Sequence, residues 1–148
     1  MSRGNQRSCI LEFDGASIGN PGPAGAGAIL YAEDGRPLYR FREGLGYQTN
    51  NVAEYRALIL GLKQAINKGF KNISVQGDSN LVINQFLGSW KINNQYLWNL
   101  CNEALQLKES FHSFSIQHIP REFNTGADAQ ANRAINLREG QVEEDAYC

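Results

Sequence analysis

Long apolar runs and an excess of positive charge are both missing from this sequence. No run approaches the ~20 residues of a membrane-spanning helix, and no apolar segment behind residues 1–7 is long enough for a signal peptide. The 14 Lys and Arg residues are balanced by 15 Asp and Glu, for a formal net charge of -1. The chain therefore lacks the global positive field by which many nucleic-acid-binding proteins attract phosphates. Composition alone points neither to a membrane partner nor to nucleic acid.

Cysteine is also scarce, with Cys9, Cys101 and Cys148 as the three examples. An odd number without CxxC spacing argues against a structural zinc site and against a disulfide framework. A reducing, intracellular compartment fits best, and the sequence does not separate nucleus, cytoplasm and a DNA-containing organelle.

The 148 residues, 42% of them hydrophobic, are enough to form one compact domain. The sequence is also compatible with one domain of a longer chain. We expect a flexible segment at 1–7, a domain at 8–138 and a frayed tail at 139–148. Period-2 patterns and turn signals predict strands, and helical spacing predicts helices. The expected strands are 9–14, 25–31, 38–44, 73–76 and 114–119, and the expected helices are 51–68, 81–87, 95–110 and 127–137. This order predicts an α/β fold with a five-stranded mixed sheet flanked by helices.

Four acidic residues stand where strands end or helices begin, and each has an ordinary structural explanation. Asp14 opens a glycine-rich turn, and Asp78 lies at a helix N-cap position. Glu54 follows Asn51 by three residues, as in a capping box, and Asp128 suits the first turn of a helix. Taken singly, each position favours structure over function.

Together these carboxylates favour a metal site. Asp14 and Asp78 close strands while Glu54 and Asp128 open helices, and such positions can converge at one end of an α/β sheet. Converging carboxylates repel one another unless cations hold them, and oxygen ligands select Mg²⁺ or Mn²⁺ over Zn²⁺. Two such ions can activate a water and stabilise the leaving oxygen of a phosphodiester. The pattern predicts a two-metal phosphodiesterase.

The segments that carry these residues resemble the four motifs of the type 1 ribonuclease H family, in order and across residues 8–138. They are FDGAS at 13–17 with GNPG at 19–22, TNNVAEY at 49–55, GDS at 77–79 and ADAQAN at 127–132. The resemblance implies strand order 3-2-1-4-5, with the first three strands antiparallel. It implies hydrolysis of the RNA strand of RNA–DNA hybrids, leaving 5′-phosphate and 3′-hydroxyl ends, with two Mg²⁺ ions that Mn²⁺ can replace. Asp14 would bridge both ions, Asp128 would complete the water-activating site, and Glu54 and Asp78 would hold the other ion.

The resemblance also implies the residues that contact the hybrid. Asn20, Asn50 and Asn51 match minor-groove contacts, for which an amide offers both a donor and an acceptor, and Thr49 matches a DNA phosphate contact. Turn chemistry for Asn20 and helix capping for Asn50 or Asn51 are the structural alternatives.

The segment 88–94 matches the family's aromatic surface and its neighbouring phosphate pocket. Trp90 is expected to stack on sugar or base, and Lys91 or Asn93 to contact phosphate, with a core position for Trp90 as the alternative. Many bacterial members of the family carry a Lys/Arg-rich extra helix, the basic protrusion, in this segment, where this chain has only Lys91. The chain therefore resembles the subgroup of the family, known from archaea, plants and viral enzymes, that lacks this protrusion.

Many relatives carry a histidine in a loop before the last motif. Here His118 falls on the predicted strand 114–119, so we expect a structural role for it. Arg121 lies in the connection to Asp128, where its guanidinium would hold a phosphate oxygen or a water, or pair with Glu122 at the surface. We include Arg121 among the catalytic residues.

Two other functions fit parts of the pattern. A noncatalytic nucleic-acid-binding module of this fold would usually lose at least one of the four carboxylates. The ribonuclease H part of a reverse transcriptase would keep them all. The partner that we expect is an RNA–DNA hybrid, bound by a monomer with no membrane association.

Overall fold

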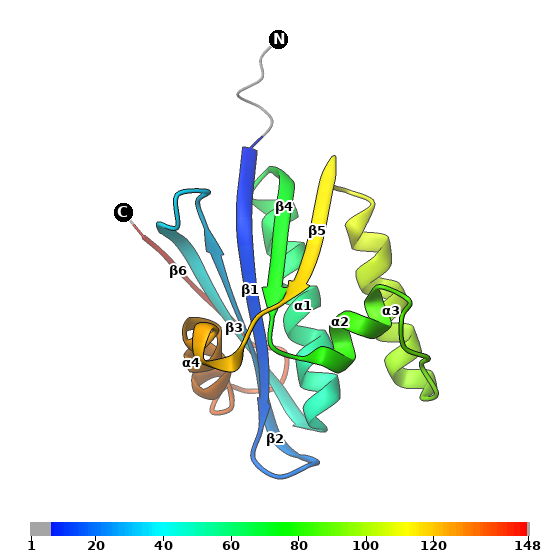
Figure 1. Ribbon diagram of the computed structural model, residues 1–148. Helices are drawn as coiled ribbons and strands as arrows, with labels where there is room; N and C mark the ends of the chain where they lie inside the picture. Colours follow the sequence, from blue (N-terminus) through cyan, green and yellow to red (C-terminus); the bar gives the residue numbers. More distant parts are fainter. Residues whose placement is uncertain (1–6, 148) are drawn as a thin grey trace.

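The computed structural model describes residues 7–147, which form one sheet with helices on both faces (Figure 1). The predicted flexible segment 1–7 lies outside these residues except for Arg7, which begins the first strand. The strands are β1 (Arg7–Ser17), β2 (Gly22–Tyr31), β3 (Pro37–Gln48), β4 (Phe70–Gly77), β5 (Ser113–His118) and β6 (Val142–Ala146). The helices are α1 (Asn50–Asn67), α2 (Asn80–Phe86), α3 (Gln95–Lys108), the short 3₁₀ helix η2 (Arg121–Phe123) and α4 (Thr125–Ala134).

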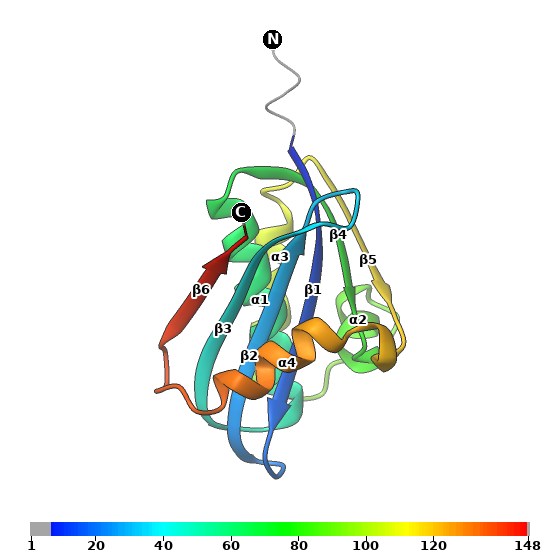
Figure 2. The same ribbon diagram turned by 90° about the vertical axis from the view of Figure 1, so that its left-hand side faces the viewer.

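The strand order is β5-β4-β1-β2-β3-β6. Strands β1, β2 and β3 form an antiparallel meander, as the resemblance implies, and β4 and β5 run parallel to β1. Figure 2 shows α4 lying across β1, β2 and β3, with α1 and α3 behind the sheet. None of the helices among residues 7–147 is long and apolar enough to cross a membrane.

The expectation of a frayed tail and of a five-stranded sheet is wrong. Residues 142–146 form β6, which extends the sheet by pairing antiparallel with β3. The acidic side chains that suggested a solvated tail are neutralised by basic partners, since Arg40 faces Asp145 and Arg42 faces Glu143 in the register. The charged C-terminal segment is thus a strand whose acidic side chains pair with basic side chains of β3.

Helix α1 carries the centre of the core between the sheet and α3. Its buried face includes Tyr55, Leu58 and Leu62, which are fully buried. Thr49 caps the helix by accepting a hydrogen bond from the Val52 N–H at 3.2 Å, and Gly69 follows with the positive φ of a C-terminal glycine. The cap defines where the helix begins, and Gly69 marks where it ends.

Helix α4 packs unusually close to the opposite face of the sheet. A Cβ atom at Gly25 or Gly27 of β2 would overlap the backbone of Ala131. Only glycine permits this approach, and α4 meets it with the fully buried alanines Ala127, Ala131 and Ala134. The small residues on both surfaces bring the α4 backbone onto the sheet.

Candidate active site

Two of the four predicted carboxylates are brought together by strand register. Phe13 of β1 pairs with Gly77 of β4 in the parallel ladder, so Asp14 and Asp78 are the next residues of adjacent strands. Asp14 does not open a turn, as the sequence suggested, because β1 continues to Ser17 and Asp14 pairs with Gly27. Asp14 is therefore held by its pairing with β2, one residue beyond the last β1–β4 pair.

Glu54 reaches the same place from the first turns of α1. A Cβ atom at Gly15 would overlap the Ala53 backbone, so glycine lets the strand touch the helix beside Glu54. The Gly15 N–H donates to Glu54 Oε1 at 3.1 Å. Ligand atoms of Asp14, Glu54 and Asp78 all lie within 4.8 Å of one another.

Asp128 completes the set from α4. It lies in the first turn of that helix, outside the group of three ligand atoms, and its hydrogen bond and charge help to raise the pKa of Asp14. The side chain of Asn132 contacts Asp128 in turn, donating to its backbone O at 2.9 Å and to Oδ1 at 3.3 Å. Asp128 thus approaches Asp14 from α4, beside the three carboxylates that β1, β4 and α1 bring together.

Burial and mutual repulsion make this cluster costly to ionise. Burial raises the pKa of Asp14 to about 8, with further contributions from the charge of Asp78 and the hydrogen bond and charge of Asp128. Burial also raises the pKa of Glu54 well above its usual value, assisted by the charges of Asp14 and Asp78 and opposed by the Gly15 N–H. A divalent cation would relieve the repulsion, and an all-oxygen donor set suits a hard cation. The donor set therefore fits a divalent metal ion.

Asn124, which the sequence analysis missed, ties the cluster to the sheet. Its side chain is fully buried, and Nδ2 donates to the Phe13 carbonyl at 2.9 Å and to Asp78 Oδ2 at 3.3 Å. Its Oδ1 has no hydrogen-bond partner among residues 7–147. An asparagine four residues before Asp128, at the start of a helix, looks like an ordinary cap, and nothing in the sequence reveals that it reaches Asp78.

The capping explanations for the acidic residues are not what the structure shows. Thr49 and Ser79 are the N-caps of α1 and α2, so neither the Asn51–Glu54 pair nor Asp78 has that role. Asn50 and Asn51 lie inside α1 and do not cap it either. Thr49, predicted to contact phosphate, uses its hydroxyl oxygen as the cap acceptor, which leaves the hydroxyl hydrogen to donate.

A groove of about 340 Å³ runs beside the start of α1. Among the residues expected to contact the hybrid, Asn20, Thr49 and Asn51 line this groove, and Asn20 Oδ1 accepts from the Asn50 N–H at 2.9 Å. The other lining residues are Gln48, Val52, Asn94, Tyr96 and Leu97. Helical spacing groups Tyr96 with the apolar positions of the predicted helix 95–110, which favours burial, but Tyr96 is 46% exposed because the first turn of α3 projects beyond the core.

The predicted contacts in segment 88–94 lie at the surface, in the connection between α2 and α3. Trp90 is 50% exposed, which excludes the alternative of a core tryptophan, and Lys91 and Asn93 are exposed as well. Trp98, in the first turn of α3, is also 50% exposed. The fully buried Tyr55 holds this connection by donating to Gln85 Oε1 at 2.7 Å, while Gln85 Nε2 donates to the Lys91 carbonyl at 3.3 Å.

His118 and Arg121 occupy different surroundings. His118 ends β5 and pairs with Gly77, and strand alternation places it on the side of Phe114 and Ile116, which pack against the core. That side faces away from α4 and Asp128. Arg121 begins η2 with an exposed side chain, three residues before Asn124.

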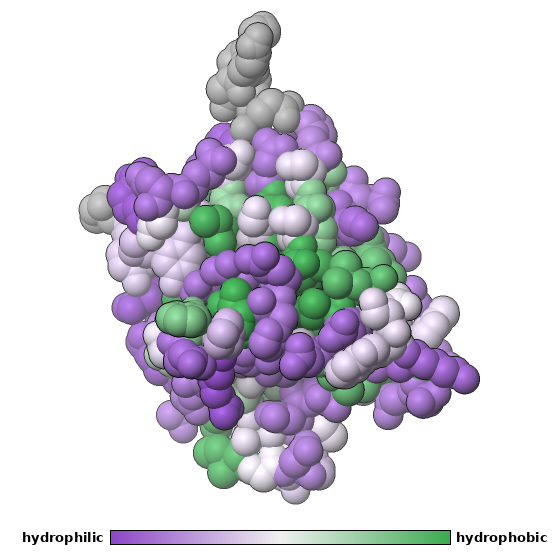
Figure 3. All heavy atoms as spheres, in the orientation of Figure 1, coloured by the Kyte–Doolittle hydropathy of each residue, from purple (hydrophilic) through white to green (hydrophobic). Residues whose placement is uncertain are grey.

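A second hollow, of about 460 Å³, lies on the part of the sheet that α4 leaves uncovered, over β1, β4 and β5. Figure 3 shows apolar groups gathered on the middle of this face, with hydrophilic ones around them. None of the predicted site residues lines this hollow.

The sheet order and the carboxylate cluster define a protein of the ribonuclease H-like class. The family model described as reverse transcriptase-like matches residues 12–134. Ribonuclease HI of Halobacterium salinarum is 44% identical over 124 residues, which cover 84% of this chain and 62% of that protein. The chain belongs to the ribonuclease H type 1 family.

Solved structures give the same result. The RNase H1 of Halobacterium salinarum superposes with a TM-score of 0.86 at 42% identity, over 88% of this chain and 99% of that one. The N-terminal RNase H domain from Mycobacterium tuberculosis gives 0.84 at 40% identity, over 88% and 94%. LC11-RNase H1, solved in complex with an RNA/DNA hybrid, gives 0.82 at 34% identity, over 86% and 96%.

The chain spans 62% of the length of the Halobacterium relative and 38% of the length of the bifunctional Mycobacterium tuberculosis protein, to which it is 40% identical.

Proposed function

We propose that this protein hydrolyses the RNA strand of RNA–DNA hybrids with two divalent metal ions. The observation that carries the proposal is that ligand atoms of Asp14, Glu54 and Asp78 lie within 4.8 Å of one another, with Asp128 beside Asp14. A groove lined by asparagines runs beside the start of α1, the helix that carries Glu54. The likeness to LC11-RNase H1, which was solved with such a hybrid, supports the choice of substrate.

The chain's own residues would hold and order the site. Asp14, at the centre of the cluster, would contact both ions, with Asp128 on one of them and Glu54 and Asp78 on the other. Bound Mg²⁺, or Mn²⁺ in its place, supplies a water that ionises near neutral pH and stabilises negative charge on the leaving oxygen. Gly15 orients Glu54 and Asn124 orients Asp78, so the carboxylates are positioned before any metal binds.

The groove supplies recognition of the hybrid. Asn20 and Asn51 would present amides to the minor groove, where a 2′-hydroxyl on one strand distinguishes RNA from DNA. The Thr49 hydroxyl hydrogen would be donated to a phosphate, and exposed Trp90 would stack on a sugar or base, with Lys91 or Asn93 near phosphate. Exposed Arg121 would hold a phosphate oxygen or a water near the cluster.

A gel assay tests this function. One labelled strand is presented in RNA–DNA, RNA–RNA and DNA–DNA duplexes, with Mg²⁺ and with a chelator. We expect cleavage of RNA in the hybrid alone, dependent on Mg²⁺ and leaving 5′-phosphate ends. Cleavage that persists in the chelator, or none in any duplex while Mn²⁺ still binds, would contradict the proposal.

A further inference from the structure

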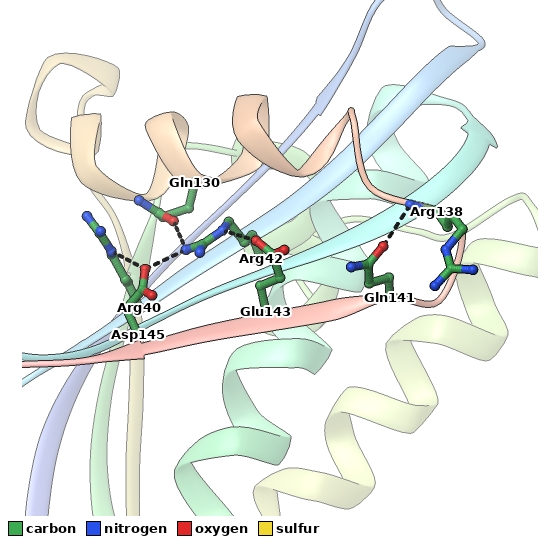
Figure 4. Close-up of polar contacts among 7 residues, drawn as sticks. All are labelled: Arg40, Arg42, Gln130, Arg138, Gln141, Glu143 and Asp145. Atoms are coloured by element: carbon green, nitrogen blue, oxygen red, sulfur yellow. Dashed lines mark hydrogen bonds and ion pairs between the residues drawn. The ribbon is translucent and has the colours of Figure 1, made fainter.

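The guanidinium of Arg42 is a buried charge between strand β6 and helix α4. Arg42 lies on β3 and is 5% exposed. Burying a charge is costly unless it is paired, and Arg42 has three acceptors (Figure 4). Its Nε donates to Glu143 Oε1 at 3.0 Å, and its Nη1 donates to Asp145 Oδ2 at 2.9 Å and to Gln130 Oε1 at 2.9 Å.

Gln130 is the member of this network that belongs to α4. It is 4% exposed and lies two residues after Asp128. The other α4 side chains that face the sheet are the alanines described above, whose contacts with glycine allow close approach but have little directionality. A hydrogen bond from a charged donor is strong and directional. The Arg42–Gln130 bond therefore gives the middle of α4 a directional contact with β3, in addition to the Asn124 bonds at the N-terminal end of the helix.

Strand β6 supplies the other two partners of Arg42. The register sets Glu143 opposite Arg42 and Asp145 opposite Arg40, whose Nε also donates to Asp145 at 2.7 Å. Without these carboxylates, Arg42 would keep one neutral partner for a buried charge and would turn toward water. The position of Gln130 thus depends on the acids of β6.

We propose that β6 positions the fourth carboxylate of the active site: Glu143 and Asp145 orient Arg42, and Arg42 holds Gln130 so that α4 presents Asp128 to Asp14. All four are positioning residues, because none of them belongs to the carboxylate cluster. The consequences for cleavage and for metal binding rest on the proposed function, whereas the consequence for α4 does not.

Substitutions at both ends of the network separate positioning from general stability. Gln130→Leu removes the acceptor at similar volume, and Gln130→Glu restores an acceptor. The double variant Glu143→Gln with Asp145→Asn keeps shape and removes charge from β6. Glu144→Gln is the matched control, because Glu144 also anchors β6, through Lys68 Nζ at 2.6 Å, without contacting Arg42.

Two measurements on the intact protein decide the inference. In metal-free protein, we expect amide hydrogen exchange in residues 125–134 to be about tenfold faster in Gln130→Leu, which loses a bond from a charged donor. We expect a similar increase in the double variant, which leaves the buried Arg42 guanidinium without a counter-charge. Mn²⁺ affinity, measured by electron paramagnetic resonance, should fall about tenfold, as is typical when residues that orient metal ligands are removed. Gln130→Glu and Glu144→Gln should resemble the parent in both measurements.

Unchanged exchange in α4, or faster exchange with unchanged Mn²⁺ affinity, would overturn the inference. A loss in Glu144→Gln as large as that in the double variant would also overturn it, since any loosening of β6 would then suffice. If the parent protein bound no Mn²⁺, there would be no metal site in which β6 could position Asp128, and the inference would also be refuted. If the parent binds Mn²⁺ but cuts no hybrid, the proposed function fails while the inference is still decided by these measurements.

Discussion

Asp14 interacts with each of the other three carboxylates. It shares hydrogen bonds with Glu54 and Asp128, and the charge of Asp78 raises its pKa. Its backbone is paired within β1 and β2, so the side chain has little freedom to move away. Repulsion at this residue must be relieved by a proton or by a cation.

We predict that Asp14→Asn abolishes hybrid cleavage and leaves the fold intact, because asparagine keeps the shape and removes the charge that both ions would share. Cleavage assays and circular dichroism on the same preparation check this. Full activity in a folded variant would refute the assignment of Asp14.

Asn124→Ala tests the buried amide behind the cluster. The variant leaves the Phe13 carbonyl without its side-chain donor and frees Asp78, so we expect a loss of roughly 1–3 kcal/mol in the free energy of unfolding. Turnover should fall as well. Urea denaturation and cleavage rates check both effects against Asn84→Ala, which removes a more exposed side-chain bond to the Asn80 carbonyl. Equal stability losses in the two variants would contradict this.

At the scale of elements, we expect different residues at the start of α1 to cap the helix and to recognise the hybrid. Thr49 is the cap, so Asn50→Ala together with Asn51→Ala should change stability little. Hybrid cutting should weaken by about 1 kcal/mol or more for each lost minor-groove hydrogen bond. Thr49→Ala, in contrast, should lower the free energy of unfolding by ~1 kcal/mol. Unchanged kinetics with a reduced melting temperature in the double variant would assign the asparagines to structure.

The connection from β5 to α4 gives a second prediction at this scale. Arg121→Ala should lower turnover about tenfold, which is ~1.4 kcal/mol in the barrier, through loss of a contact with phosphate or water. His118→Ala should leave the rate of the folded protein nearly unchanged, because His118 lies on the side of the sheet away from Asp128. Steady-state rates of the two folded variants decide between them, and the reverse pattern would give His118 the catalytic role.

The sequence predicted elements whose signal is local. Helix α1 was expected at 51–68 and lies at 50–67, since helical spacing and a terminal glycine mark it clearly. What the sequence could not show depends on distant partners. Strand β6 needs the basic residues of β3, about a hundred positions away, before its acids are neutralised. Asn124 likewise acquires its role only when the fold brings Asp78 beside it.

For the candidate site, too, local sequence motifs were predictive, whereas contacts between distant residues were not. The four motifs located the carboxylates, and register and helix packing bring them together. The exposure of Tyr96 could not be predicted, because helical spacing alone does not tell which turns of α3 extend past the sheet.

Across the whole molecule, two groups of carboxylates respond to pH in opposite ways. Asp14, whose pKa is raised from 3.8 to about 8, holds a proton in the folded protein that it would lose when unfolded. Its contribution to stability is present below pH ~4 and is lost as the pH rises through about 8. Glu54 acts in the same direction.

Asp145 is the opposite case, since hydrogen bonds from Arg42 and Arg40 lower its pKa from 3.8 to about 2. Its contribution is present above pH ~4 and is lost as the pH falls through about 2.

We therefore predict that the metal-free protein is most stable in mildly acidic solution and becomes less stable toward pH 8. Mg²⁺ should remove most of the loss on the alkaline side, because the cation replaces the protons that neutralise the cluster. Thermal melting in a chelator and in Mg²⁺ measures this, with an expected difference of at least ~3 °C at pH 8, which corresponds to about 1 kcal/mol. Asp14→Asn should flatten the metal-free profile between pH 4 and 8 and should melt no lower than the parent there. Asp145→Asn should lower stability by a constant amount above pH ~4 and should change the slope of the profile only below it. An equal change of slope between pH 4 and 8 in both variants would show that the carboxylate cluster is not the source of the pH dependence.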